Sequence, residues 1–66
     1  MTTDHTTLLI DIEAQAYRAG ITKSDLDRAE CRRLCAAARN AGVVEQDILD
    51  ACGRAWHRSM RAEARR

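Results

Sequence analysis

The stretches AGITKSDLDRA (residues 19–29) and AGVVEQDILDA (residues 41–51) share the pattern that decides the fold. In each stretch a glycine follows an alanine and precedes a β-branched residue, and an aspartate, an aliphatic residue and an alanine return at matching later positions. Glycine readily adopts the left-handed conformation in which many helices end, so Gly20 and Gly42 each predict a helix end. Two helix ends within the chain predict three helices.

The pattern therefore predicts an all-α fold, a small three-helix bundle with two Ala-Gly-Ile/Val corners. The helices are expected at about residues 7–19, 23–40 and 45–63. Proline is absent and β-branched residues are sparse outside the corners, which argues against a sheet. A chain of this length has room for a single helical domain, residues 1–66. We expect residues 1–5 to be a flexible N-terminus and residues 64–66 a frayed basic C-terminus.

The first corner also predicts how the second helix begins. After Gly20, Thr22 stands where an N-cap is needed, and Asp25 follows at the third position of a capping box. Ile21 and Leu26 have the spacing of a hydrophobic staple, in which the residue before the cap packs on the fourth helical residue.

The other two helix starts have weaker signals. Val43 and Ile48 repeat the staple at the second corner, but Val44 has no side-chain oxygen with which to cap the third helix. At the first helix, the hydroxyl of Thr6 or Thr7 is the expected cap.

The residues expected inside the bundle recur at helical spacing. They are Leu9, Ile12, Ala16 and Ala19 in the first helix, Cys31, Leu34, Cys35, Ala37, Ala38 and Ala41 in the second, and Ile48, Cys52, Ala55, Trp56, Ser59 and Met60 in the third. Ile10, Ala14 and Tyr17 form a second stripe on the first helix, which predicts contacts on two sides, either with a partner or within the bundle. Trp56 is assigned to the core because the chain is poor in aromatic residues, with a binding anchor as the alternative.

The apolar residues are too few and too small for a large core. Aromatic residues make up 3% of the chain, and phenylalanine is absent. A domain of this size buries only about 60% of the surface that its unfolded chain exposes. Because small domains often gain stability by association, we expect a homodimer or a protein partner that completes the core.

Three cysteines form a candidate metal cluster. Cys31 and Cys35 are four residues apart and share a face of the second helix. In an antiparallel arrangement Cys52 of the third helix reaches the same level, and three thiolates with a fourth ligand make a tetrahedral zinc site. The fourth ligand is missing, because Trp56 stands one turn after Cys52 and His57 points elsewhere. We therefore expect core cysteines, no metal and no cofactor, with zinc as the alternative.

The sequence shows no catalytic constellation. The two histidines lie near opposite ends of the chain, and there is no glycine-rich phosphate loop. Acidic residues gather at the expected helix N-termini, where the helix dipole favours negative charge. We expect that the protein is not an enzyme.

Arginines at helical spacing make the third helix the candidate recognition surface. Arg54, Arg58, Arg61 and Arg65 form one stripe, and His57 flanks it. Guanidinium groups bind both phosphates and the carboxylates of an acidic protein. The alternative is a solvated helix end, because cations complement the dipole at a helix C-terminus.

Asp50 also has the spacing to pair with Arg54 within the helix. Such a pair would belong to a solvated helix surface.

The function that these features favour is that of a non-catalytic protein-interaction module, dimeric, that regulates or inhibits a larger protein. Phage and mobile-element genomes encode many short inhibitors of this kind. Leu8, Ile10 and Tyr17 would supply the apolar contact, and the arginine stripe the charged one. The alternative is a small helical DNA- or RNA-binding regulator that uses the same stripe, although the net charge of +1 gives no general attraction to nucleic acid.

The odd number of cysteines predicts a cytoplasmic protein, because a disulfide framework needs paired cysteines. The N-terminal residues lack the basic and apolar regions of a signal peptide, and no apolar stretch approaches the length of a membrane span, so we expect no membrane partner.

Overall fold

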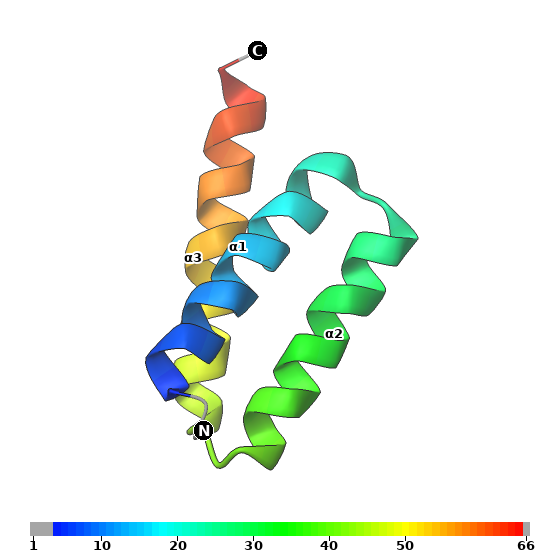
Figure 1. The fold of residues 1–66 in the computed structure, drawn as a ribbon. Coiled ribbons are helices and arrows are strands. Elements are labelled where there is room, and N and C mark those ends of the chain that lie inside the picture. Colours follow the sequence, from blue (N-terminus) through cyan, green and yellow to red (C-terminus); the bar gives the residue numbers. More distant parts are fainter. Residues whose placement is uncertain (1–3, 66) are drawn as a thin grey trace.

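A computed structural model describes residues 4–65, which form three helices joined by two short connections (Figure 1). The helices are α1, His5–Thr22; α2, Asp25–Asn40; and α3, Glu45–Ala64. The predicted all-α three-helix fold is confirmed, and the described residues contain no strand.

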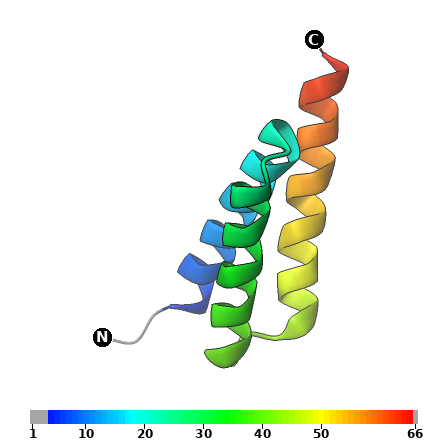
Figure 2. The same cartoon turned by 90° about the vertical axis from the view of Figure 1, so that its right-hand side faces the viewer.

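Helix α1 packs against both other helices, whereas α2 and α3 make few contacts with each other. The chain direction is the same in α1 and α3 and opposite in α2 (Figure 1). The C-terminal part of α3 extends beyond the other two helices (Figure 2). Of the second predicted stripe of α1, Ile10 and Ala14 are exposed and Tyr17 is half-buried, so the contacts with α2 and α3 leave most of that stripe uncovered.

The second connection forms as the sequence predicts. Gly42 has a φ of +90°, and its N–H donates to the carbonyl oxygen of Arg39 at 3.1 Å. The N–H of Val43 donates to the carbonyl oxygen of Ala38 at 3.0 Å, which completes a Schellman motif. Val43 and Ile48 are both buried in the core, as the staple requires.

The first connection differs from the prediction. Gly20 lies inside α1, which continues to Thr22. The left-handed residue is Lys23, with a φ of 56°, and its N–H donates to the carbonyl oxygen of Ala19 at 2.8 Å. Ser24 is the N-cap of α2. The helix therefore ends later, relative to its glycine, than the repeated pattern indicates.

The predicted capping box and staple of α2 are consequently wrong. Thr22 does not cap α2; its hydroxyl donates instead to Oδ2 of Asp27 at 2.6 Å. Asp25 is the first residue of the helix rather than the third. Leu26 is 83% exposed and does not form a buried staple with Ile21.

Gly20 is needed for the contact between α1 and α3. A Cβ placed on Gly20 would lie 2.7 Å from Cβ of Ser59 and would overlap its Oγ. Ala55 and Ser59 are buried on the facing side of α3. Small residues on both helices thus allow the two backbones to approach closely.

The N-cap of α1 differs from the prediction. Asp4, rather than Thr6 or Thr7, caps α1, because its Oδ1 accepts a hydrogen bond from the N–H of Thr6 at 3.1 Å. The expected flexible N-terminus (1–5) and frayed C-terminus (64–66) lie partly outside the described residues.

The apolar core lies at the end of the bundle that contains the second connection, which we call the core end. Its buried members are Ile12, Cys35, Ala38, Val43, Ile48 and Ala51, with Leu8, Leu9, Cys31, Leu34 and Cys52 packed against them. We call the opposite end, formed by residues 16–22, 25–28 and 55–64, the open end. Among the described residues there, only the small side chains of Ala55 and Ser59 are fully buried.

Four residues predicted inside the bundle are exposed: Ala37, Ala41, Trp56 and Met60. The correction matters most in α3, where Trp56 is 60% and Met60 50% exposed. Each of these two follows directly after a buried small residue. Helix α3 is therefore rotated so that the small residues face α1 and the large ones do not.

Candidate functional site

A groove crosses the open end of the bundle, and all three helices contribute to it. It is lined by Ala16, Ala19, Gly20, Lys23, Arg28, Trp56, Ser59, Met60 and Glu63. The residues from α1 are small, whereas α3 contributes the large apolar side chains of Trp56 and Met60. An ion pair of 3.1 Å between Nζ of Lys23, in the first connection, and Oε1 of Glu63 links that connection to α3 beside the groove.

Three large apolar residues lie on one exposed face of α3. Leu49, Trp56 and Met60 are 54%, 60% and 50% exposed, and their helical spacing places them on the same side. We call them the exposed apolar face. The sequence does not predict this face, because helical spacing and the scarcity of aromatic residues place Trp56 and Met60 in the core. One feature of the sequence does indicate the exposed apolar face. Ala55 and Ser59, each one residue before a large apolar residue, form a stripe of small residues that suits a close helix contact.

Half of the predicted arginine stripe is engaged by α1. Glu13 Oε1 lies 3.1 Å from Arg54 Nε and 4.0 Å from Arg58 Nη1. The guanidinium carbon of Arg58 also lies 5.0 Å from the ring centre of Tyr17, a cation–π contact. Arg54 therefore pairs across the bundle rather than with Asp50 of its own helix.

The other predicted binding residues of α3 lie beside the engaged arginines: His57 and Arg61 line one hollow with Arg54 and Arg58, and Arg61 and Arg65 line another with Tyr17. His57, Arg61 and Arg65 are exposed, and within residues 4–65 neither of these two arginines forms an ion pair. In α1, Ile10 is 59% exposed, but Leu8 is half-buried against the core. The predicted apolar surface of the first helix is therefore smaller than the exposed apolar face of α3.

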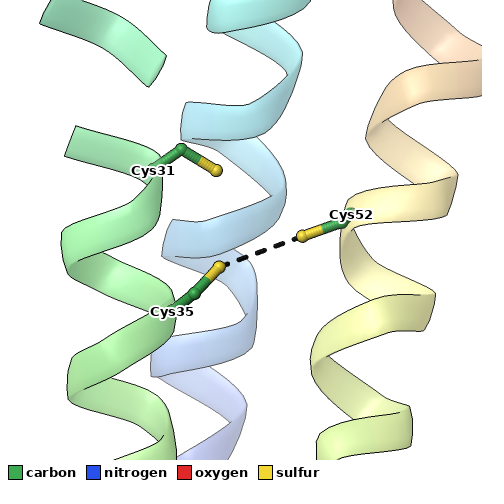
Figure 3. Close-up of side chains that lie close together, drawn as sticks. All are labelled: Cys31, Cys35 and Cys52. Carbon is green, nitrogen blue, oxygen red and sulfur yellow. Dashed lines mark hydrogen bonds between the residues drawn. The ribbon is translucent and has the colours of Figure 1, made fainter. Parts of the chain in front are cut away.

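The three cysteines converge, as their spacing indicates. Cys31 and Cys35 of α2 and Cys52 of α3 direct their sulfur atoms into the space between the two helices (Figure 3). All three Sγ atoms lie within 4.8 Å of one another, and those of Cys35 and Cys52 are 4.0 Å apart. Cys35 is buried and the other two are half-buried, and all three are free thiols.

The environments of Cys31 and Cys52 favour the protonated form of these two thiols. Burial, followed by the influence of neighbouring Cys35, raises the pKa of Cys52 to about 12. Burial is also the main cause that raises the pKa of Cys31. Because the thiolate is the reactive form of cysteine, these thiols are poor nucleophiles at neutral pH. The arrangement does not suit cysteine catalysis.

The most extensively bonded carboxylate, that of Asp27, holds α1 and α2 together. Its pKa is lowered chiefly by the hydrogen bond from Thr22, and the side chains of Gln15 and Arg18 contribute further. Gln15 Nε2 also donates to the backbone carbonyl of Asp27 at 3.0 Å. These partners keep the carboxylate ionised and in place, which suits a structural role rather than general acid–base chemistry.

The fold defines the chain as a small all-α three-helix protein. Comparisons with protein-family models, curated proteins and solved structures find no match. Within the part of the chain that the structure describes, no helix has the length and apolar character needed to cross a membrane.

Proposed function

We propose that the protein is a non-catalytic interaction module that binds a larger protein and thereby regulates or inhibits it. The observation that carries this proposal is the exposure of Trp56, 60%, with Met60 beside it, at a groove lined by small residues. Tryptophan is enriched among the residues that dominate protein–protein binding energies.

The uneven core supports the same proposal. The large aliphatic residues that are buried lie at the core end, whereas the open end buries only Ala55 and Ser59 among the described residues. A small domain with so little core gains stability when a partner covers its apolar surface. An apolar side chain of a partner, placed in the groove, would contact Trp56 and Met60 and supply the packing that this end lacks.

The charges around the groove fit the rim of an interface. Lys23 and Glu63 form an exposed ion pair there, and Arg28 also lines the groove. Protein interfaces commonly surround an apolar centre with polar groups that stay accessible to water. Arg61 and Arg65, which helical spacing turns away from Trp56, line a separate surface with Tyr17.

A second candidate function is nucleic-acid binding, favoured by the exposed Arg58, Arg61 and Arg65, which line a shallow surface with Tyr17. This candidate is the weaker one, because Glu13 forms ion pairs with Arg54 and Arg58 and so offsets part of the positive charge of the stripe. Binding through several phosphate contacts would weaken by orders of magnitude with a modest increase in salt, whereas an apolar protein interface would not.

Site-specific photo-crosslinking distinguishes these candidates. A photoreactive phenylalanine analogue is placed at position 56, with matched probes at exposed Ala36 of α2 and at Arg61 of α3. We expect the probe at position 56 to crosslink one larger protein in cells that express the chain, and unlabelled wild-type protein to compete. The probe at position 36 should not give this product.

Three other outcomes of the crosslinking experiment would contradict the proposal or assign a different partner. A position-56 probe that crosslinks no more protein than the position-36 probe would contradict the proposal. A crosslink from position 56 to a second copy of the chain would assign this face to a homodimer instead of a larger partner. Nucleic acid crosslinked at position 61, with no protein at position 56, would favour the second candidate.

A further inference from the structure

We propose that Cys31, Cys35 and Cys52 form a three-thiolate site for a thiophilic d10 metal ion, Zn²⁺ or Cu⁺, that bridges α2 and α3. This site lies outside the groove and the arginine stripe, so it goes beyond the proposed interaction function. Figure 3 shows the three sulfur atoms directed toward a common point from two different helices.

The separations of the sulfur atoms fit one metal ion. Cys35 and Cys52 Sγ are 4.0 Å apart, and no pair in the cluster exceeds 4.8 Å. The centre of a triangle with such edges lies about 2.3–2.8 Å from each corner, and zinc–thiolate bonds are about 2.3 Å long. Small side-chain rotations therefore bring all three sulfurs to bonding distance without movement of the helices.

The ligand set selects the kind of ion. Thiolates are soft ligands, which favour Zn²⁺ and Cu⁺ over Mg²⁺ or Ca²⁺. Residues 4–65 add no histidine, fourth cysteine or carboxylate to the cluster. Cu⁺ accepts three ligands, whereas Zn²⁺ would complete a tetrahedron with a water molecule, which can enter beside the half-buried Cys31 and Cys52.

The bound form of the site would carry negative charge. On binding, each thiol gives its proton to solvent and the ion takes its place, so the site carries net negative charge. Arg39 lies within electrostatic reach of Cys35 and Cys52, and its guanidinium group is paired with Glu45.

The position of the site gives the metal a structural effect. Helices α2 and α3 make few contacts with each other, and α1 alone packs on both. An ion held by Cys31 and Cys35 on one helix and Cys52 on the other would link the pair directly. Because the unfolded chain does not preform the site, bound metal would stabilise the folded state.

The test uses reduced full-length protein, freed of metal and kept without oxygen. It is titrated separately with Zn²⁺ and with Cu⁺. We expect one ion per chain by native mass spectrometry and protection of all three thiols from alkylation. We also expect a rise in Tm on the order of 10 °C when free metal exceeds the Kd a hundredfold. Binding by only one of the two ions would identify which of them the site takes.

Serine variants supply the controls. Cys31→Ser, Cys35→Ser and Cys52→Ser should each weaken binding at least tenfold, whereas Ala37→Ser on the exposed side of α2 should bind like the wild type. If buried Cys35→Ser does not fold, the two half-buried positions still decide the result. Absence of a one-to-one complex, one ion shared by two chains, or unchanged binding by Cys31→Ser would overturn the proposal.

Discussion

At the scale of single residues, the missing side chain of Gly20 determines how α1 meets α3. Its Cα faces Ser59 so closely that a Cβ would lie 2.7 Å from Ser59 Cβ. Gly53 of α3 is also within a helix, but a Cβ there would meet nothing within 4 Å. The two glycines therefore form a matched pair for testing the helix contact.

We predict opposite effects for alanine at these two positions. Gly20→Ala should destabilise the protein, because overpacking costs roughly 1–3 kcal/mol and outweighs a gain in helix propensity of up to about 1 kcal/mol. Gly53→Ala should stabilise it by about 0.5–1 kcal/mol. Urea unfolding measures both. Adding Ser59→Gly to Gly20→Ala should recover stability beyond additivity, and equal stabilisation by both alanines would contradict the close contact.

The exposure of Trp56 decides whether this residue belongs to the core or is available for binding. Because its side chain is 60% exposed, we predict that Trp56→Ala costs no more than about 2 kcal/mol, by the area it buries. Truncation of a fully buried tryptophan would cost roughly 3–5 kcal/mol. Thermal unfolding checks the difference, with buried Ile48→Ala as the costly control. If Trp56→Ala lowered the stability as much as Ile48→Ala does, Trp56 would be a core residue and this account of its exposure would be wrong.

At the scale of helices and connections, the two corners show what local sequence can predict. Gly42 ends α2 as expected, because its positive φ and the buried pair Val43 and Ile48 need only nearby residues. Gly20 fits the same local pattern, yet serves a contact with Ser59, far along the chain. A glycine that permits positive φ and one that permits close packing look alike in sequence. For this reason the sequence pattern places the N-cap of α2 at Thr22, whereas the structure has it at Ser24.

The candidate site was only partly predictable for the same reason. The four-residue spacing of Cys31 and Cys35, with an antiparallel α2 and α3, was enough to indicate convergence with Cys52. Two apolar stripes lie side by side on α3, and the sequence does not say which one faces α1. The stripe that contains Ser59 is buried because its small residues admit α1, which leaves Trp56 exposed.

The left-handed residue at the first connection gives an element-scale prediction. Lys23 has a φ of 56°, a conformation that costs a residue with a Cβ about 1 kcal/mol relative to glycine. Lys23→Gly and Lys23→Ala both remove the ion pair with Glu63, so comparing them isolates the backbone. We predict that the glycine variant is the more stable by about 1 kcal/mol in urea unfolding. Gly42→Ala should destabilise by a similar amount, and a more stable Lys23→Ala would refute this account of the connection.

At the scale of the whole molecule, the protein is a bundle with two unlike ends. The core end contains the buried aliphatic residues and the cysteine cluster. The open end has a small-residue seam, a groove and the overhanging C-terminal part of α3 (Figure 2). Most of the buried aliphatic packing thus lies at one end, and the groove with exposed Trp56 lies at the other, which supports the proposed interaction function.

Native mass spectrometry of the wild type and Trp56→Ala, each isolated from the same expressing cells at low and at high salt, tests this claim most directly. We predict that the wild type retains a larger protein partner at high salt, and that Trp56→Ala, folded by circular dichroism, does not. Equal retention by both proteins would contradict a binding role for Trp56. Nucleic acid that accompanies both proteins at low salt and is lost at high salt, with no protein partner, would contradict the interaction-module function.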